Sequence, residues 1–179
     1  MPTNRFRSRL ALGFASLWSG CSLSAGPAFT RPTSSGASIA VGPSIEGALQ
    51  LPRSFQTFAG IDWSQPGTPN DSWRLGLSYG YTTLPTATGR LAWEISARGG
   101  VLGAASTASA GGFGGGRVAM LLRLGSLAEP WEADSAFGAT SMIVADVGVN
   151  GLARSGASLE GEISSRVLLR IHFSSALLP

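Results

Sequence analysis

The sequence has no lysine, one cysteine, one histidine and few charged residues of any kind. All thirteen basic residues are arginine, and charged residues make up 13% of the chain. Soluble proteins usually cover their solvent-facing surface with Lys and Glu, so this composition counts against a large aqueous surface. The single cysteine, Cys21, excludes an intrachain disulfide. No cluster of residues has the spacing of metal ligands, so we expect neither a metal nor a cofactor.

The chain also lacks a long hydrophobic run, although 44% of its residues are hydrophobic. No stretch reaches the ~18 apolar residues that a membrane-spanning helix needs. A Lys/Arg-rich run is missing as well. Arg5, Arg7 and Arg9 lie in the N-terminal segment that we expect to be cleaved off. The remaining ten of the thirteen arginines are balanced by ten acidic residues, so the mature chain has a net charge near zero. This balance excludes nucleic acid as a partner.

Residues 1–21 have the build of a secretory signal peptide, with three arginines, an apolar run and then small residues. Cys21 follows Ser19 and Gly20 directly after the apolar run, which resembles the lipobox of bacterial lipoproteins. The resemblance implies that Cys21 is lipidated and becomes the first mature residue, although Trp18 stands where that family usually carries Leu. Cleavage after Ala25 is the alternative. Residues 22–37 are rich in Ser, Pro, Gly and Ala and predict a flexible leader, followed by one domain over 38–179.

Strict alternation is the most prominent feature of the remaining chain. In residues 72–82, large apolar side chains such as Trp73 and Leu77 take one phase, and Arg74 and Ser78 take the other. A period of two indicates a β-strand with two different faces. The same pattern, separated by turn residues, predicts an all-β chain with strands at 38–50, 54–63, 72–82, 90–98, 116–125, 140–150 and 159–173. An eighth strand is predicted at 101–109, reached through a tight hairpin turn at Gly99 and Gly100. The glycine-rich residues 111–116 are predicted to be a flexible connection.

Charged and polar residues share one phase of these strands. If that phase lines the lumen of a barrel, the predicted polar network consists of Glu46, Asp62, Arg74, Arg90, Glu94, Arg98, Arg117, Arg123, Asp146, Glu160, Glu162, Arg166, Arg170 and His172. We expect Glu94 to pair with an arginine of a neighbouring strand, such as Arg74. These ion pairs would fill the lumen of a narrow barrel, which argues against a wide pore.

Strand length and aromatic placement favour a membrane barrel over a soluble sandwich. The predicted strands are longer than the ~5–6 residues usual in soluble proteins. Aromatic residues gather near strand ends on the apolar phase, as in the girdles of a membrane barrel: Phe55, Trp63, Trp73, Tyr79, Tyr81 and Trp93. Over residues 38–173 the pattern resembles the small eight-stranded outer-membrane barrels of the OmpA/OmpX type. The resemblance implies an antiparallel up-and-down β-barrel embedded in the bacterial outer membrane, with Trp73 and Tyr79 facing lipid and Arg74 facing the lumen.

Three functional interpretations follow. The first is a small non-enzymatic outer-membrane barrel with a structural, surface-interaction or minor permeation role, in contact with membrane lipid and a surface or periplasmic protein. The second is an exported lipoprotein whose soluble, lipocalin-like barrel binds an apolar ligand, with its apolar phases pointing inward. The third rests on His172 and Ser174, whose spacing resembles the lipid A deacylase barrels of the PagL type, where such a pair acts as base and nucleophile. An acidic, aromatic stretch around Trp131 is expected to be a solvated loop.

Overall fold

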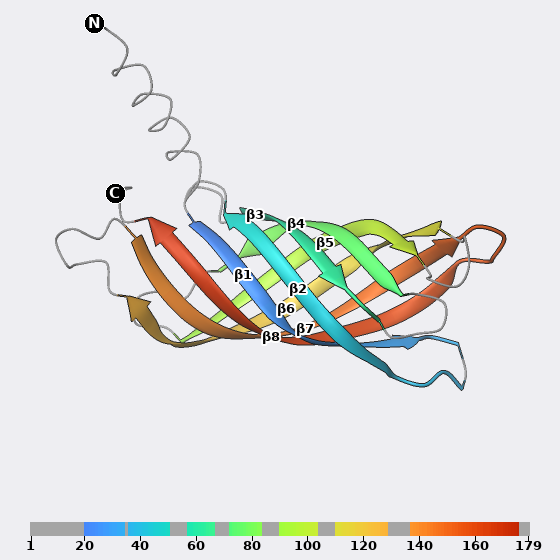
Figure 1. The fold of residues 1–179 in the computed structure, drawn as a ribbon, viewed down its shortest axis with the longest axis horizontal. Helices are drawn as coiled ribbons and strands as arrows, with labels where there is room; N and C mark the ends of the chain where they lie inside the picture. The colour runs from blue at the N-terminus through green and yellow to red at the C-terminus, as the bar shows by residue number, and fades with distance from the viewer. Residues whose placement is uncertain are drawn as a thin grey trace, which may run out of the picture.

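The computed structural model describes residues 20–34, 36–50, 57–66, 72–83, 90–103, 110–128 and 137–175, which form one closed barrel (Figure 1). Every neighbouring pair of strands is antiparallel, and β8 returns to pair with β1. The predicted all-β, up-and-down barrel of eight strands is therefore confirmed. The described residues contain no helix long and apolar enough to cross a membrane. The strands are β1 Gly20–Pro32, β2 Ala40–Gln50, β3 Thr57–Ser64, β4 Trp73–Thr82, β5 Leu91–Gly103, β6 Ala110–Ala128, β7 Phe137–Arg154 and β8 Glu160–Ser175.

The first strand lies where a flexible leader was predicted, so that prediction is wrong for residues 22–32. Gly20 pairs with Gln50 of β2 on one side and with Ser174 of β8 on the other, so β1 closes the barrel. Its side chains alternate as the barrel requires, with Ser24 buried and Leu23 exposed. The ladder between β1 and β8 is interrupted at Gly26 and Pro27, because proline has no N–H to donate.

The predicted eighth strand at 101–109 is also wrong, because its first residues belong to β5. Val101–Gly103 continue β5, opposite Leu75 and Trp73 of β4, and residues 104–109 lie outside the described part of the chain. Gly99 and Gly100 do not form a turn. A Cβ on Gly100 would stand 2.1 Å from the carbonyl oxygen of Leu75, so this glycine allows two strand backbones to approach each other.

The glycine-rich residues 111–116 belong to β6 and are not a flexible connection. Within them, Phe113 points into the barrel and is buried. A Cβ on Gly115 would stand 2.0 Å from the carbonyl oxygen of Val149 on β7, which explains why no larger residue occupies this inward position.

The register sets how strongly the strands tilt. Following hydrogen-bonded partners around the barrel from Gly20 returns to β1 at Thr30, ten residues further along, through Gln50, Phe58, Gly80, Ser96, Arg117, Gly148 and Ser164. A stagger of this kind in eight strands gives a tilt of ~35–45° and an interior just wide enough for side chains. We call the end where β1 starts the Gly20 rim and the opposite end the Glu160 rim.

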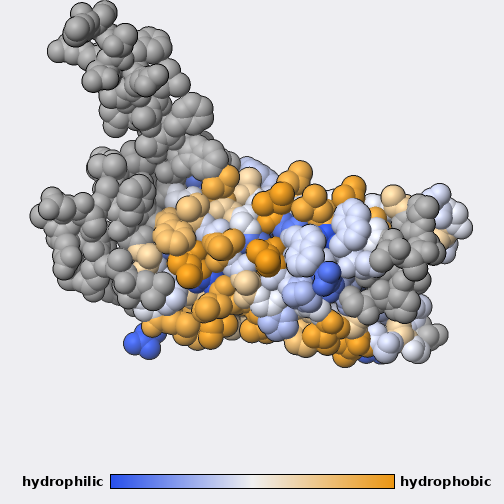
Figure 2. All heavy atoms as spheres, in the orientation of Figure 1, coloured by the Kyte–Doolittle hydropathy of each residue, from blue (hydrophilic) through white to orange (hydrophobic). Residues whose placement is uncertain are grey.

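The two faces of the barrel wall differ sharply. Large apolar side chains cover the outside, where Leu77 is 67% exposed and Ile95 is 60% exposed. Figure 2 shows much of this outer surface as hydrophobic. The inside holds charged side chains together with two apolar clusters, one of Ala92, Ala119, Leu121, Met142, Val144 and Leu168, the other of Leu102, Phe113 and Leu152. This arrangement is the reverse of a soluble barrel.

Candidate functional site

The interior of the barrel brings together eleven of the fourteen residues predicted for the polar network. All eleven are buried, and they come from seven of the eight strands: Glu46, Asp62, Arg74, Glu94, Arg98, Arg117, Asp146, Glu162, Arg166, Arg170 and His172. Five of them are arginines and five are acids, so the formal charges of the interior cancel when His172 is neutral. Burying so many charges is tolerated only when they are paired and hydrogen-bonded.

Glu46 of β2 is the centre of the largest ion-pair group. Its carboxylate receives hydrogen bonds from Arg117 at 2.5 Å, Arg166 at 2.6 Å and Arg170 at 3.1 Å. Asp146 accepts a second hydrogen bond from Arg166 at 2.9 Å and lies 3.6 Å from Arg117. We call these five residues the central cluster. It joins β2 directly to β6 and β8 across the interior, which ties opposite walls of the barrel together.

Arg170 extends this cluster toward two further strands. Its Nη1 donates to Glu94 on β5 at 2.5 Å, and its Nε donates to the hydroxyl of Ser24 on β1 at 3.0 Å. One guanidinium therefore connects β1, β2, β5 and β8. Arginine suits this role because its planar group carries five N–H donors in a fixed geometry.

Two smaller groups lie further toward the Glu160 rim. Arg74 of β4 makes a bidentate pair with Glu162 of β8, with both N–O distances at 2.6 Å, and Asn150 donates to the same carboxylate at 3.2 Å. Arg98 pairs with Asp62 at 3.1 Å, and its guanidinium lies 5.1 Å from the ring centre of Phe113. The second contact is a cation–π interaction inside the barrel.

The expected pairing of Glu94 with Arg74 is wrong. In the register Glu94 lies opposite Thr82, which is eight residues from Arg74 along β4. That separation corresponds to ~26 Å along the strand, beyond the reach of two side chains. Each partner is instead found across the interior, at the same height in the barrel.

Three predicted network residues lie outside the lumen. Arg90 precedes β5 and is exposed, and Arg123 is half-buried beside a register shift between β6 and β7. Glu160 is the first residue of β8, where its side chain is 32% exposed and pairs with Arg154 at 2.8 Å. All three have the correct phase but lie at the rims. Phase alone does not reveal height along the barrel axis.

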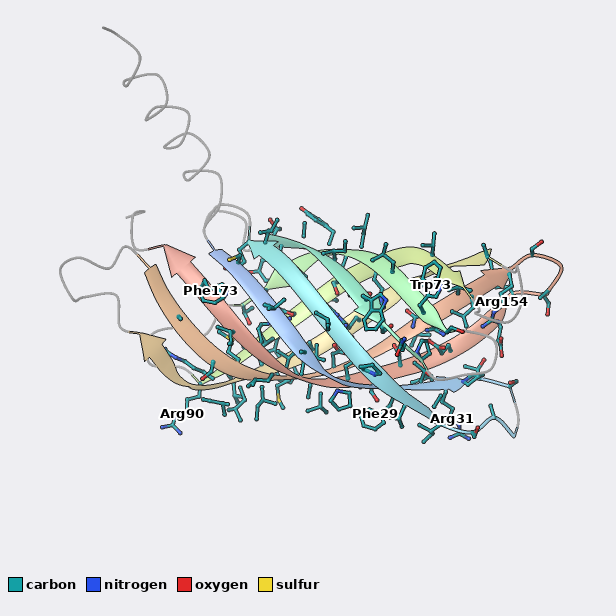
Figure 3. The ribbon with its side chains drawn as sticks, viewed as in Figure 1. Phe29, Arg31, Trp73, Arg90, Arg154 and Phe173 are labelled. Atoms are coloured by element: carbon teal, nitrogen blue, oxygen red, sulfur yellow. The ribbon has the colours of Figure 1, made fainter. Side chains whose placement is uncertain are left out.

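The predicted girdle residues face outward wherever the structure describes them. Trp73, Tyr79, Tyr81 and Trp93 are exposed, Trp63 is half-buried, and Phe55 lies outside the described residues. In Figure 3, Trp73 lies toward one end of the barrel and Phe173 toward the other. Trp73 and Tyr81 are eight residues apart on β4, or ~26 Å along the strand and ~20 Å along the axis after tilt. That spacing is close to the ~25 Å apolar band of an outer-membrane barrel.

His172 and Cys21 both lie near the Gly20 rim. His172 is buried on the inner face between Ser22 of β1 and Thr140 of β7, and the side chain of Ser174 lies outside the described part. Cys21 is exposed between Leu49 and Phe173. Within the described ranges, no group of His, Cys, Asp and Glu residues could hold a metal ion.

Sequence reasoning missed the uncharged members of the interior. Ser24, Ser44 and Asn150 each hydrogen-bond a charged partner. They share the inward phase of their strands, and that phase was the only available signal. Arg154, the partner of Glu160, was missed because its segment has the composition of a loop.

Comparison with known proteins gives one informative likeness. Neither a family model nor a curated protein matches the sequence. Among solved structures, the chain is similar to the crystal structure of Neisserial surface protein A (NspA), with 12% sequence identity and a TM-score of 0.53. The alignment covers 86% of this chain and 96% of that chain. The predicted likeness to small eight-stranded outer-membrane barrels is therefore confirmed at the level of fold, and the chain shares its closed eight-stranded barrel with that protein.

Proposed function

We propose that this chain is a non-enzymatic β-barrel of the bacterial outer membrane, with a filled interior and a structural or surface-interaction role. One observation carries the proposal: a closed barrel exposes large apolar side chains on its outer wall and buries ten charged side chains inside. In water such an outer wall would be an aggregation-prone apolar surface, whereas in a bilayer it is the surface that lipid requires. The fold shared with an outer-membrane barrel supports the same location.

The interior argues against an open pore. The Arg117–Glu46 and Arg74–Glu162 pairs cross the lumen between opposite strands, β6 to β2 and β4 to β8. The Arg166–Glu46 and Arg98–Asp62 pairs each join strands that are two apart in the barrel. Apolar clusters on the inner wall lie beside them, with Met142 opposite Arg170 and Leu102 opposite Arg74 in the register. In an eight-stranded barrel, side chains of this size are enough to fill the interior. The proposed barrel therefore does not conduct ions, which favours anchoring or surface interaction over permeation.

The other two interpretations receive less support. A lipocalin-like soluble barrel requires apolar side chains inside, but Leu77, Ile95 and their neighbours point outward. A lipid-modifying enzyme requires a nucleophile and base that lipid can reach, but His172 is only 8% exposed and faces the interior. The non-enzymatic membrane barrel is therefore the interpretation that the exposed and buried side chains support best.

For export, we propose that the precursor is cut ahead of Cys21 and not after Ala25. Residues 20–25 pair with both β2 and β8, so removing them would open the seam of the barrel. The hydroxyl of Ser24, a partner of Arg170, would be lost as well. An acyl chain attached to Cys21 would start at the lipid-facing surface beside Phe173.

Membrane fractionation combined with gel mobility tests the proposal. We expect the full chain to stay in the outer-membrane fraction after salt and alkaline washes, and to migrate differently before and after boiling. Planar bilayers containing the refolded protein should show no steady ion conductance. Release by a mild wash would overturn the membrane location, and sustained single-channel currents would overturn the filled interior.

A further inference from the structure

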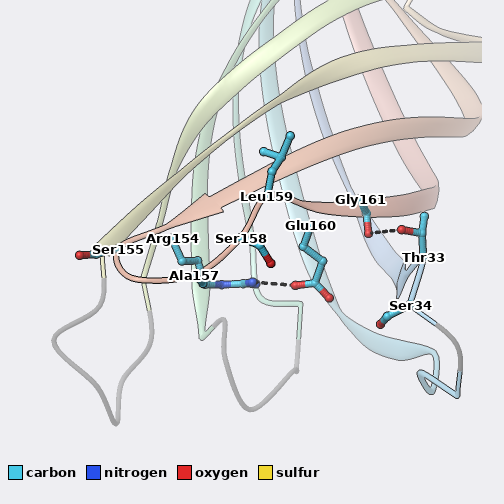
Figure 4. Close-up of a pocket in the computed structure, with 9 residues that line it drawn as sticks. All are labelled: Thr33, Ser34, Arg154, Ser155, Ala157, Ser158, Leu159, Glu160 and Gly161. Atoms are coloured by element: carbon cyan, nitrogen blue, oxygen red, sulfur yellow. Dashed lines mark hydrogen bonds and ion pairs between the residues drawn. The ribbon is translucent and has the colours of Figure 1, made fainter.

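The Glu160 rim carries a pocket of about 600 Å³ between two turns that are far apart in the sequence (Figure 4). One wall comes from the β7–β8 turn and the start of β8, and the other comes from Thr33 and Ser34, just after β1. The volume lies within the ~300–1,000 Å³ that small-molecule sites usually occupy. None of the ion-pair groups inside the barrel contributes to this pocket, so it is a separate feature of the molecule.

Hydrogen bonds hold the two walls together. The backbone N–H of Thr33 donates to the carbonyl oxygen of Gly161 at 2.8 Å, and the Thr33 hydroxyl donates to the same oxygen at 3.0 Å. The β7–β8 turn is closed by the N–H of Ala157, which donates to the carbonyl oxygen of Arg154 at 3.2 Å. Gly156 in this turn has φ of 75°, a conformation that favours glycine. The pocket is therefore formed before any ligand arrives, which lowers the entropy cost of binding.

The lining has the chemistry of a site for a neutral polyhydroxyl group. Ser34 and Ser158 contribute hydroxyls, each of which can both donate and accept a hydrogen bond. Arg154 and Glu160 pair at 2.8 Å and remain 14% and 32% exposed, so both can reach a ligand. Their charges cancel, so the lining has no net attraction for an anion or a cation. Hydroxyls and charged groups at the same time disfavour an apolar ligand.

The position of the pocket indicates where such a group would come from. Leu159 lines the pocket and is 76% exposed, and Val149 on the outer wall of β7 is 61% exposed. The polar pocket thus opens beside the apolar surface that we propose faces lipid. An amphiphile could place its head in the pocket and its chains along the barrel wall.

We propose that this rim pocket binds the neutral polyhydroxyl headgroup of a membrane glycolipid. The inference rests on the proposed membrane location, because a soluble barrel would offer the pocket only to free saccharides. Sugar headgroups match the lining through adjacent hydroxyls that donate and accept together, and the Arg154–Glu160 pair offers donors and acceptors side by side.

Lipid binding to the purified full chain, kept in a detergent without sugar groups, tests this inference. The probes are monogalactosyl diacylglycerol, phosphatidylcholine with the same acyl chains, and free methyl galactoside, with occupancy measured by native mass spectrometry. We expect the glycolipid to bind at least tenfold more tightly than phosphatidylcholine, and the free sugar to bind more weakly than the glycolipid. Equal binding of the two lipids would overturn the site. Equal binding of free sugar and glycolipid would overturn the lipid source.

Two substitutions with matched controls locate the binding. Ser158→Trp fills the pocket and should lower glycolipid affinity at least tenfold, whereas Ser38→Trp changes an exposed serine of the same rim outside the pocket and should leave affinity unchanged. Glu160→Gln removes the negative charge that balances Arg154 in the pocket, so the protein should bind anionic phosphatidylglycerol more tightly than the unmodified chain does. Arg90→Gln at the opposite rim should not increase phosphatidylglycerol binding. Identical behaviour of each variant and its control would overturn the assignment.

Gel mobility before and after boiling is recorded for every variant. A chain that fails the membrane-extraction test overturns the proposed function and this inference together. A correctly embedded barrel that shows no glycolipid preference overturns this inference alone.

Discussion

Glu46 and Glu160 make ion pairs of similar length in very different surroundings. Glu46 lies 2.6 Å from Arg166 and its side chain is completely buried, whereas Glu160 lies 2.8 Å from Arg154 and remains 32% exposed. Water and salt screen the rim pair, but they do not reach the central cluster. Ion pairs of similar length therefore contribute differently to the free energy of unfolding, and burial decides which pair the fold depends on.

The strongest test of this comparison removes Glu46. Glu46→Gln leaves Arg117, Arg166 and Arg170 inside the barrel without their shared carboxylate. Breaking one buried ion pair costs ~3–5 kcal/mol, so the loss of a carboxylate shared by three arginines should be at or above that range. Urea titration of the barrel in lipid vesicles, followed by tryptophan fluorescence, measures the loss. A stability equal to that of the unmodified chain would show that the interior is wet enough to screen its charges.

A double-mutant cycle sharpens the same comparison inside the barrel. Arg170→Ala leaves the buried carboxylate of Glu94 without its guanidinium and should cost ~3–5 kcal/mol in free energy of unfolding. Glu94→Ala should cost less, because Arg170 keeps its ion pair with Glu46. Because they remove the same contact, the double variant should cost less than the sum. Arg74→Ala combined with Glu94→Ala serves as the control and should be close to additive, since Arg74 pairs with Glu162. Strict additivity for Glu94 and Arg170 would contradict the observed pairing.

Adjacent residues on β4 compare the two faces of the wall. Leu77→Arg places a charge on the outer surface, at an expected cost of ~2–4 kcal/mol near the middle of a bilayer. Ser78→Arg enters the interior and meets other side chains instead, so we expect a milder loss of assembly. The yield of the heat-modifiable form in vesicles measures both variants. Equal tolerance of the two substitutions would contradict the orientation of the wall.

The smallest effect is expected at the rim. Glu160→Ala removes the partner of Arg154, and a partly exposed pair of this kind contributes ~0–1 kcal/mol. The urea midpoint should therefore hardly move, in contrast to Glu46→Gln measured in the same vesicles. A loss as large as that of Glu46→Gln would mean that burial does not distinguish the two pairs.

Period-two alternation was enough to predict the central residues of the seven strands β2 to β8 and the face on which most charges lie, but not the ends of β5 and β6. Arg74 and Glu162, for example, follow from phase alone as inward residues. Their partnership does not, because partners across the interior depend on the ten-residue stagger of the whole barrel. No single strand carries that information.

The strand boundaries show the other limit of sequence reasoning. Residues 22–32 are rich in Ser, Ala, Gly and Pro, and they follow a segment with the build of a signal peptide, so most of β1 was interpreted as a leader. Gly99 and Gly100 were interpreted as a turn because a glycine pair commonly forms one. Only the close approach of β4, opposite Gly100, distinguishes an inward strand glycine from a turn glycine.

The seam between β1 and β8 has a consequence for the order of assembly. It joins the first and last strands of the barrel, and the hydrogen bond from Arg170 to Ser24 spans 146 residues of sequence. Contacts between such distant segments form slowly, because the intervening chain must be ordered first. Until β8 arrives, β1 has a free edge that could pair with any other strand. Closure of this seam, which is already interrupted at Pro27, is therefore the step at which a folding catalyst would act with the greatest effect.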